Sequence, residues 1–286
     1  GGRCNVTNAA TSNDDLLAGY PRGFRELRGP FTRFNNNDTI SWFEKLGVAL
    51  KAESDGRIFP VSDHSSSIVD CLMHEAEKFG VEIRLGSGVK KIIPDDAGFT
   101  LQMDSGQIRA EKVIVTSGGN ANLNGYSFLN DLGLKIIDPV PSLFTFNIPG
   151  SPFIEIMGVS VQDVAIRITG SKFHVRGPFL FTHWGISGPA VLRLSSLAAR
   201  WLAEKQYIFN IQLNFVPSLN QEQLREELME HLNISSDKLV LNSRIFGLSS
   251  RLWEILCRMA GIDDRKKWGE VSRLNLNKLI ELIASF

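Results

Sequence analysis

An uninterrupted apolar run at residues 112–116, Lys-Val-Ile-Val-Thr, leads directly into Ser117, Gly118 and Gly119. Such a run is typical of a strand that is buried on both faces of a parallel sheet. Glycines at the carboxyl end of that kind of strand let a ligand approach the backbone closely. The run therefore predicts an α/β domain with a ligand at this end of its sheet.

The residues before this run indicate how the predicted strand is reached. A helix is expected from about Ser65 to Phe79, followed by a strand at 81–85. Three strand-like runs separated by turn residues come next, at 88–93, 99–103 and 107–110, and they predict an antiparallel meander. The helix has apolar residues at helical spacing, which predicts a buried stripe of Ile68, Leu72, Ala76 and Phe79.

The first eight residues, Gly1-Gly2-Arg3-Cys4-Asn5-Val6-Thr7-Asn8, are dense in glycine and polar side chains. Arg3 offers a planar set of donors for a phosphate or carboxylate, and the amides and hydroxyl can cap turns or bind a ligand. This composition predicts a ligand-binding loop. Downstream, Asp38 is expected to cap a helix that ends at Gly47, and Asp55-Gly56 predicts a hairpin turn between 48–51 and 57–61.

The composition of the chain changes near Pro141 to Pro152, where prolines cluster between short apolar runs. This change predicts a boundary between a first domain at 1–142 and a second at 143–286. Strand patterns dominate 143–216 and helical patterns dominate 217–286, with residues 179–189 expected to form a loop rich in glycine and aromatic residues. The predicted fold class is therefore α/β plus α+β.

Composition excludes several classes of protein. The 286 residues are 43% hydrophobic and 22% charged, which is typical of a globular protein, and the formal net charge is +0, without the basic excess of a nucleic-acid binder. We find no run of about 18 apolar residues that could span a bilayer. The first residues also lack the charged segment followed by an apolar segment that is typical of a signal peptide, so a cytoplasmic location is expected. Three scattered cysteines argue against a disulfide framework and a zinc site, so no metal is expected.

Four stretches occur in the order seen in one family. They are residues 2–8 (Gly-Arg-Cys-Asn-Val-Thr-Asn), 56–63 (Gly-Arg-Ile-Phe-Pro-Val-Ser-Asp), 116–119 (Thr-Ser-Gly-Gly) and 180–192 (Leu-Phe-Thr-His-Trp-Gly-Ile-Ser-Gly-Pro-Ala-Val-Leu). In these stretches the chain resembles the BaiN/RdsA family of bacterial flavoproteins, which are FAD- and NAD(P)-linked oxidoreductases with an inserted domain. The similarity spans nearly the whole chain.

The resemblance implies a partial FAD- and NAD(P)-binding, Rossmann-like domain, followed by an inserted domain with a β-rich part and a helical part. It implies hydride transfer from NAD(P)H through FAD to a small organic acceptor such as a conjugated enone, without nucleic-acid or membrane partners. The residues implied to contact the cofactor are Gly2, Arg3, Cys4, Asn5, Thr7, Asn8, Val89, Ser117, Gly118 and Gly119.

Two features of the family pattern do not occur in these residues. The glycine-rich G-x-G-x-x-G turn that lies upstream of G-R-C-N-V-T-N in the family is absent, and so is a glycine-rich segment after the inserted domain. The sequence is therefore expected to be the middle of a flavoprotein, trimmed at both ends.

His183 is the candidate catalytic residue, because an imidazole beside Trp184 on a glycine-flanked loop could protonate a substrate held against a flavin. The alternative for this pair is structural: Trp184 packs, and His183 caps the helix that begins near Pro189. Two other functions stay open, namely an amine-oxidising flavoenzyme and a non-catalytic fragment that cannot hold FAD alone. The oligomeric state is not indicated.

Overall fold

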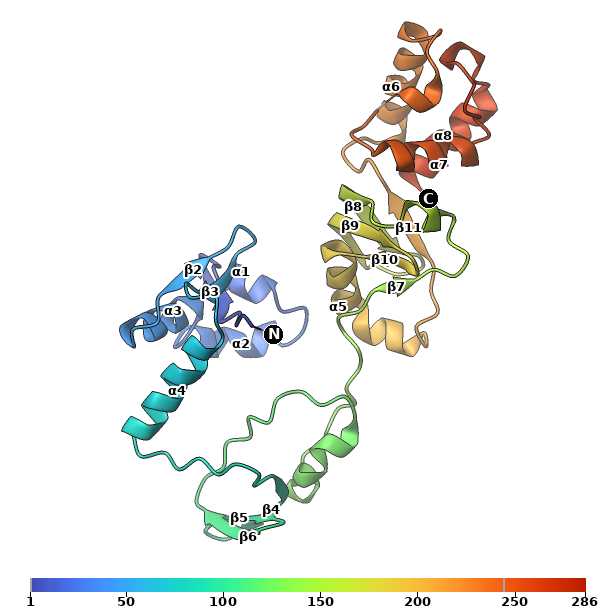
Figure 1. Ribbon diagram of the computed structural model, residues 1–286. Coiled ribbons are helices and arrows are strands. Elements are labelled where there is room, and N and C mark those ends of the chain that lie inside the picture. The colour runs from blue at the N-terminus through green and yellow to red at the C-terminus, as the bar shows by residue number, and fades with distance from the viewer. Residues whose placement is uncertain (1, 244) are drawn as a thin grey trace. The chain divides into compact units, whose positions relative to one another are not determined.

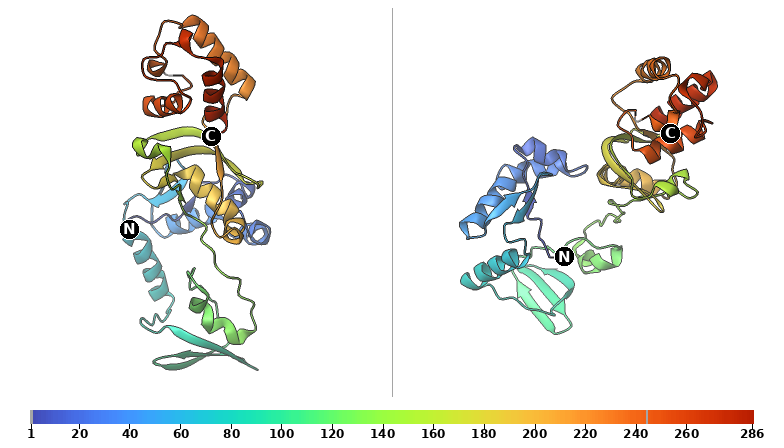
Figure 2. Two further views of the ribbon diagram at one scale, coloured as in Figure 1. Left: turned by 90° about the vertical axis from the view of Figure 1, so that its right-hand side faces the viewer. Right: turned by 45° about the horizontal axis from the view of Figure 1, so that its top comes forward.

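The computed structural model describes residues 2–243 and 245–286 of the chain (Figure 1). These residues form two compact units. The first comprises Gly1–Gly118 and Asn124–Ile136, and the second comprises Gly119–Leu123 and Ile137–Phe286. Figure 2 shows the same elements from two further sides.

The first unit begins with a small sheet and its covering helices. The strands β1 (Thr7–Asn8), β2 (Leu50–Ala52) and β3 (Arg57–Pro60) pair antiparallel in the order β1-β3-β2. Between β1 and β2 the chain forms α1 (Asn13–Ala18), α2 (Phe24–Phe31) and α3 (Asn36–Lys45). The predicted hairpin at Asp55-Gly56 is confirmed as the turn between β2 and β3.

The cap of α3 differs from the prediction. Asn35 is the N-cap residue, and its side chain accepts hydrogen bonds from the backbone N–H groups of Asn37 and Asp38. The Asp38 carboxylate accepts a hydrogen bond from the Asn35 N–H in return, at 2.9 Å. The two residues form a capping box, so Asp38 closes the box three residues inside the helix and is not the cap itself.

The rest of the first unit is α4 (Ser66–Lys78), then β4 (Val89–Asp95), β5 (Gly98–Met103) and β6 (Gly106–Ala110), and a 3-10 helix at Leu123–Leu132. The strands form a separate antiparallel sheet in the order β4-β5-β6, which confirms the predicted meander (Figure 1). The predicted strands at 81–85 and 112–116 are wrong: neither run is in a strand.

Exposure explains this difference. Leu85 is 89% exposed and Ile114 is 87% exposed, so neither run is covered on both faces as a buried strand would be. The stripe predicted on α4 is wrong for the same reason, because Ile68 is buried but Leu72 and Phe79 are exposed. Apolar spacing alone therefore did not predict which of these residues are buried.

The second unit contains a curled five-stranded antiparallel sheet in the order β11-β8-β9-β10-β7. Its strands are β7 (Phe146–Asn147), β8 (Ser160–Ile168), β9 (His174–Thr182), β10 (Gly185–Ser187) and β11 (Ile211–Asn214). A 3-10 helix, Pro152–Ile156, precedes β8, and α5 (Pro189–Glu204) packs on β8, β9 and β10. Val191, Leu194 and Leu202 are fully buried on its inner face, as its spacing predicts.

The last part of the second unit is helical. It consists of α6 (Gln221–Ile234), α7 (Ser250–Met259) and α8 (Arg273–Ala284), with short 3-10 turns at Val240–Asn242 and Trp268–Glu270. Trp253 and Trp268 are buried at its centre, and their indole N–H groups donate to the Val240 carbonyl and the Ser243 hydroxyl. One continuous apolar core joins these helices to the sheet. In this unit the last strand ends at Asn214, and the three helices α6, α7 and α8 follow it.

Candidate functional site

The opening loop lies against the β2–β3 hairpin. Thr7 pairs with Ile58 and Asn8 with Arg57 in the ladder between β1 and β3, and Gly2 accepts a hydrogen bond from the Ser65 N–H. The loop and the G-R-I-F-P-V-S-D stretch are therefore one structural site. Pairing to β3 holds the loop in an extended form that its glycine-rich sequence would not adopt alone.

Arg3 is the centre of this site. Its guanidinium lies 3.9 Å from the centroid of the Phe59 ring, forms an ion pair with Glu53, and lies 3.0 Å from the Asp63 carboxylate. The hydrogen bond that Arg3 donates to the Glu53 carboxylate is the main cause of a raised pKa at Arg3. Arg3 is therefore a fixed cation whose donors already face carboxylates.

Asp63 joins Arg3 to a second cation. Its carboxylate lies 2.6 Å from the Lys51 amine, and this hydrogen bond, with the charge of Arg3, lowers the pKa of Asp63. Its backbone has a φ of 57°, a left-handed conformation that is rare for a residue with a side chain. Residues in such conformations cluster at functional sites.

The cluster around Arg3 is balanced in charge. Arg57 pairs with both Asp55 and Glu53, so Arg3, Lys51 and Arg57 face Glu53, Asp55 and Asp63. A balanced cluster does not supply the excess positive charge that a pyrophosphate needs. The cluster instead orients the loop. The sequence contained a signal for these partners, since Glu53, Asp55 and Asp63 all lie in or beside the second matching stretch.

The amides of the loop have structural roles. Turned so that its nitrogen faces acceptors, the Asn5 amide donates to the carbonyls of Ile58 and Thr7. The Asn8 side chain accepts from the Ala10 N–H at 2.9 Å, while the buried Asn36 amide donates to the Asn8 carbonyl. Asn5 and Asn8 therefore stabilise the turns of the loop, which is one of the two roles expected for them. The binding of a ligand by these residues stays a prediction.

The remaining candidates of the first unit lie outside this cluster. Val89 begins β4 and pairs with Met103, while Ser117 and Gly118 follow β6 in an irregular segment. In the described part of the chain, no hydrogen bond or ion pair joins residues 113–119 to the opening loop. The structure therefore groups Gly2, Arg3, Cys4, Asn5, Thr7 and Asn8, and it does not group them with Val89, Ser117 or Gly118. Gly119 belongs to the second unit.

His183 is also in the second unit, where the structure replaces the expected loop with a hairpin. Gly185 pairs with Thr182, so His183 and Trp184 form the two-residue turn between β9 and β10. Thr182 is half-buried, and its hydroxyl accepts a hydrogen bond from the Gly185 N–H at 3.1 Å. The loop prediction for 179–189 is therefore wrong, because β9 ends at Thr182, β10 covers Gly185–Ser187 and α5 begins at Pro189.

The turn presents an exposed imidazole. The His183 and Trp184 rings meet edge to face with their centroids 4.2 Å apart, and Trp184 donates to the Thr145 hydroxyl at 3.2 Å. His183 does not cap α5, whose N-cap is Gly188 without a side-chain hydrogen bond. The His183 ring therefore packs against Trp184 on one side and is exposed to solvent.

Residues 140–286 match the family described as HI0933-like protein barrel and H2TH domain. The chain belongs to the HI0933-like family. The match begins close to the start of the second unit's compact residues at Ile137 and covers its sheet and helices. The resemblance to a flavoprotein oxidoreductase family is thereby confirmed, as is the mixed α and β character of the fold.

Curated relatives extend the similarity to the first unit. A ribosomal RNA dihydrouridine synthase from Escherichia coli is 31% identical over 274 residues, which are 92% of this chain and 64% of that protein. A 3-dehydro-bile acid delta(4,6)-reductase from Clostridium scindens is 27% identical over 81% of this chain and 58% of its own length. A ribosomal RNA dihydrouridine synthase from Haemophilus influenzae is 27% identical over 99% of this chain and 69% of that protein. The HI0933-like chain thus spans under two thirds of the first two relatives.

Among residues 2–243 and 245–286, no group of three or more His, Cys, Asp or Glu side chains is arranged to hold a metal ion. Within the same residues, no helix is both long and apolar enough to cross a bilayer.

Proposed function

We propose that this chain is part of an FAD-dependent oxidoreductase in which hydride passes from NAD(P)H through the flavin to a small organic acceptor such as a conjugated enone. The observation that carries the proposal is the similarity to a named bile acid reductase and a named dihydrouridine synthase, over 81% and 92% of the chain. Dihydrouridine is uridine with one ring double bond reduced. Both names therefore describe the chemistry of a ring double bond conjugated to a carbonyl.

The residues of the first unit support contacts with the flavin ring system of FAD and not with its pyrophosphate. Gly118 has a φ of 75°, and a Cβ built on it would meet nothing within 4 Å, so a cofactor could approach its backbone. The Arg3 cluster is neutral as a whole and holds the opening loop rigid on β3. In this proposal the loop contacts the flavin with its backbone, and Arg3 acts as a positioning residue. The bound flavin would supply the hydride.

The second unit supports a role in proton transfer. A ring double bond that accepts a hydride also needs a proton, and an exposed imidazole is suited to donate one near neutral pH. In this proposal His183 is that donor. Its contact with Trp184, which is itself hydrogen-bonded to Thr145, fixes the direction of the ring.

Titration with FAD tests the proposal. We expect the chain to bind FAD with micromolar or tighter affinity and the bound flavin to absorb near ~450 nm. We expect NADPH to bleach this absorbance when oxygen is absent. Gly118→Val should weaken binding by tenfold or more. Gly133→Val is the matched control, since Gly133 also has a positive φ, 65°, and open space in the same unit. A folded chain that takes up no FAD would support the alternative of a non-catalytic fragment.

A second function is favoured by two of the relatives, which are named ribosomal RNA dihydrouridine synthases. In that case the acceptor would be a uracil ring within RNA. The two functions are separated by supplying reduced flavoprotein with either a cyclic enone or a ribosomal RNA transcript. Faster flavin reoxidation by the enone supports a small-molecule acceptor, and faster reoxidation by RNA supports the second function.

A further inference from the structure

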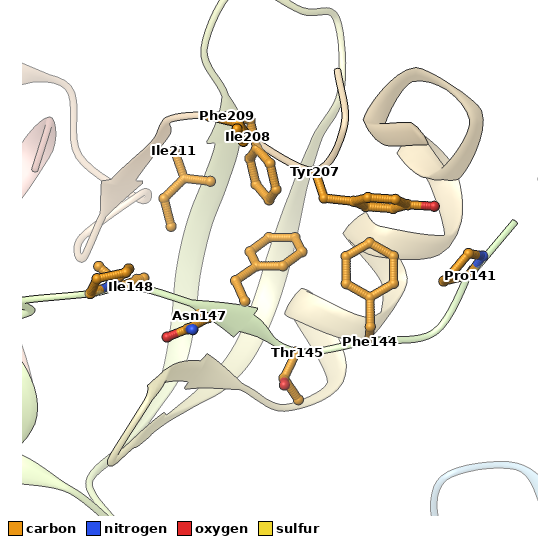
Figure 3. A pocket seen from close by; sticks show the side chains of 11 residues that line it. Pro141, Phe144, Thr145, Asn147, Ile148, Tyr207, Ile208, Phe209 and Ile211 are labelled. Atoms are coloured by element: carbon orange, nitrogen blue, oxygen red, sulfur yellow. The ribbon is translucent and has the colours of Figure 1, made fainter. Parts of the chain in front are cut away.

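The second unit contains a cavity of about 600 Å³ that no motif of the sequence indicated (Figure 3). One wall is β7 with its flanking residues, from Phe144 to Pro149, and the opposite wall is the segment from Tyr207 to Ile211 that enters β11. These walls come from the two outer strands of the five-stranded sheet. Because both edges line one cavity, the sheet curls far enough to form a half-barrel, and the cavity is its open side.

The walls of the cavity are aromatic and carry no charged side chain. Phe146 and Phe209 meet edge to face at 5.0 Å between ring centroids, and Phe144 and Tyr207 meet in the same way at 5.8 Å (Figure 3). Faces and edges of such rings bind flat apolar molecules well. A phosphate-bearing ligand would find no cation here to pair with.

The backbone beside the cavity is held in an unusual conformation. At the end of α5 the Tyr207 N–H donates to the Leu202 carbonyl and the Gln206 N–H donates to the Ala203 carbonyl, which is a Schellman cap. Glycine is the usual residue at such a position, yet Gln206 and Tyr207 have φ values of 53° and 60°. This left-handed conformation is unfavourable for residues that have a side chain. It turns the chain so that the Tyr207 ring covers one side of the cavity.

The polar neighbour of this wall lies outside the aromatic surface. The Thr145 side chain points away from the cavity, on the side of the chain opposite to the Phe144 ring (Figure 3). Its hydroxyl accepts a hydrogen bond from the Trp184 indole, and the Trp184 ring meets the His183 ring edge to face.

We propose that this cavity binds a neutral, planar, fused-ring molecule, with its rings against Phe146, Phe209 and Tyr207. The volume agrees with sites of about 300–1,000 Å³ for small ligands, and a single pyrimidine ring would fill only a small part of it. That the ligand is the hydride acceptor rests on the proposed function. The binding itself does not, because it needs no flavin.

Fluorescence titration of the flavin-free chain with pyrenemethanol tests the site, and pyrenesulfonate supplies the same rings with a charge. We expect micromolar binding of pyrenemethanol and at least about tenfold weaker binding of the sulfonate. Ile208 at the cavity is 81% exposed, and Leu274 on α8 of the same unit is 79% exposed. Ile208→Asp should weaken pyrenemethanol binding about tenfold, whereas Leu274→Asp should not change it.

A second pair of variants removes a ring without adding a charge. Tyr207 is 42% exposed and Tyr20, in the first unit, is 40% exposed. Tyr207→Ala should weaken pyrenemethanol binding about tenfold, and Tyr20→Ala should leave it unchanged, with circular dichroism showing that all variants are folded. Equal effects of each variant and its control, or equal binding of the two probes, would overturn the proposal. These outcomes are independent of FAD titration, so failure of the cavity site and failure of the flavoenzyme assignment are distinguishable.

Discussion

Gly185, in the hairpin that carries His183, is required by the backbone of β7. A Cβ at this position would lie 2.3 Å from the Phe146 carbonyl oxygen and 2.8 Å from the Ile148 nitrogen, and the φ of 155° is already unfavourable for other residues. Neither backbone atom can move without breaking the β7–β10 pairing. We expect Gly185→Ala to lower the free energy of unfolding of the second unit by about 2–3 kcal/mol, measured by urea denaturation.

Gly170 provides the control for this prediction. It has a φ of 73°, but a Cβ there would meet nothing within 4 Å. Gly170→Ala therefore adds backbone strain without a clash, and it should cost only about 1 kcal/mol. Equal losses for the two variants would show that the close approach of β7 is not what requires glycine at position 185.

Cys257 is predicted to be inert in the folded protein. It is fully buried on α7, and burial, with a smaller effect of Glu254, raises the pKa of its thiol to about 12. Since the thiolate is the reactive form, iodoacetamide at pH 8 should not modify Cys257 until the helical part unfolds. Mass spectrometry of labelled peptides measures this, with the half-buried Cys4 and Cys71 as internal references. Labelling of Cys257 as fast as Cys4 in the native protein would contradict the prediction.

The helical part of the second unit contains a histidine whose pKa differs between the folded and the unfolded chain. His231 on α6 lies against the Trp268 ring, and burial, with a smaller effect of Lys238, lowers its pKa below the ordinary value of 6.5. The unfolded chain therefore takes up a proton at a higher pH than the folded chain does. Stability contributed by neutral His231 is present above about pH 6.5 and is lost as the pH falls below that value.

Denaturation at pH 7.5 and pH 5.5 measures this effect. We expect a lower free energy of unfolding at pH 5.5, and His231→Gln should reduce the difference. His174 lies exposed on β9 of the same unit, so His174→Gln should leave the difference unchanged. If the pH dependence of the free energy of unfolding is unchanged in His231→Gln, other titrating groups cause it.

Which elements could be predicted from the sequence depends on where their stabilising contacts lie. The meander, the β2–β3 hairpin and the inward face of α5 follow from local turn chemistry and from periodicity. The runs at 81–85 and 112–116 have the right composition for strands, but a strand exists only through hydrogen bonds to a partner, which periodicity does not supply.

The candidate site shows the same division. That the opening loop is polar and glycine-rich could be read from the sequence, but the contacts of Arg3 with Phe59, Glu53 and Asp63 could not, because they join residues about 50 positions apart through tertiary folding. The aromatic cavity was missed because its two walls are distant in sequence, and each wall by itself resembles an ordinary apolar strand.

For the whole molecule, the two units should differ in stability. The large apolar core lies entirely within residues 144–286, whereas buried apolar side chains in the first unit are few. Because buried apolar area is the main source of stability, we expect residues 137–286 to fold alone and the first unit to unfold at lower denaturant concentration.

Tryptophan fluorescence can separate the two steps. Trp42 lies in the first unit, and Trp253 and Trp268 are buried in the second. Trp42→Phe should remove the fluorescence change of the early step and keep the late one. A single cooperative transition that is unaffected by this variant, or an unfolded 137–286 fragment, would show that the units depend on each other.

The unpaired run at 112–116 affects how this protein behaves in concentrated solution. Ile114 and Val115 are exposed, and the backbone of this run does not pair with a strand in the described residues. The run also has high β-propensity. A segment of this kind can pair with the same segment of another copy, which is the first step toward aggregation. Ile114→Lys should therefore make the chain less prone to aggregate at high concentration.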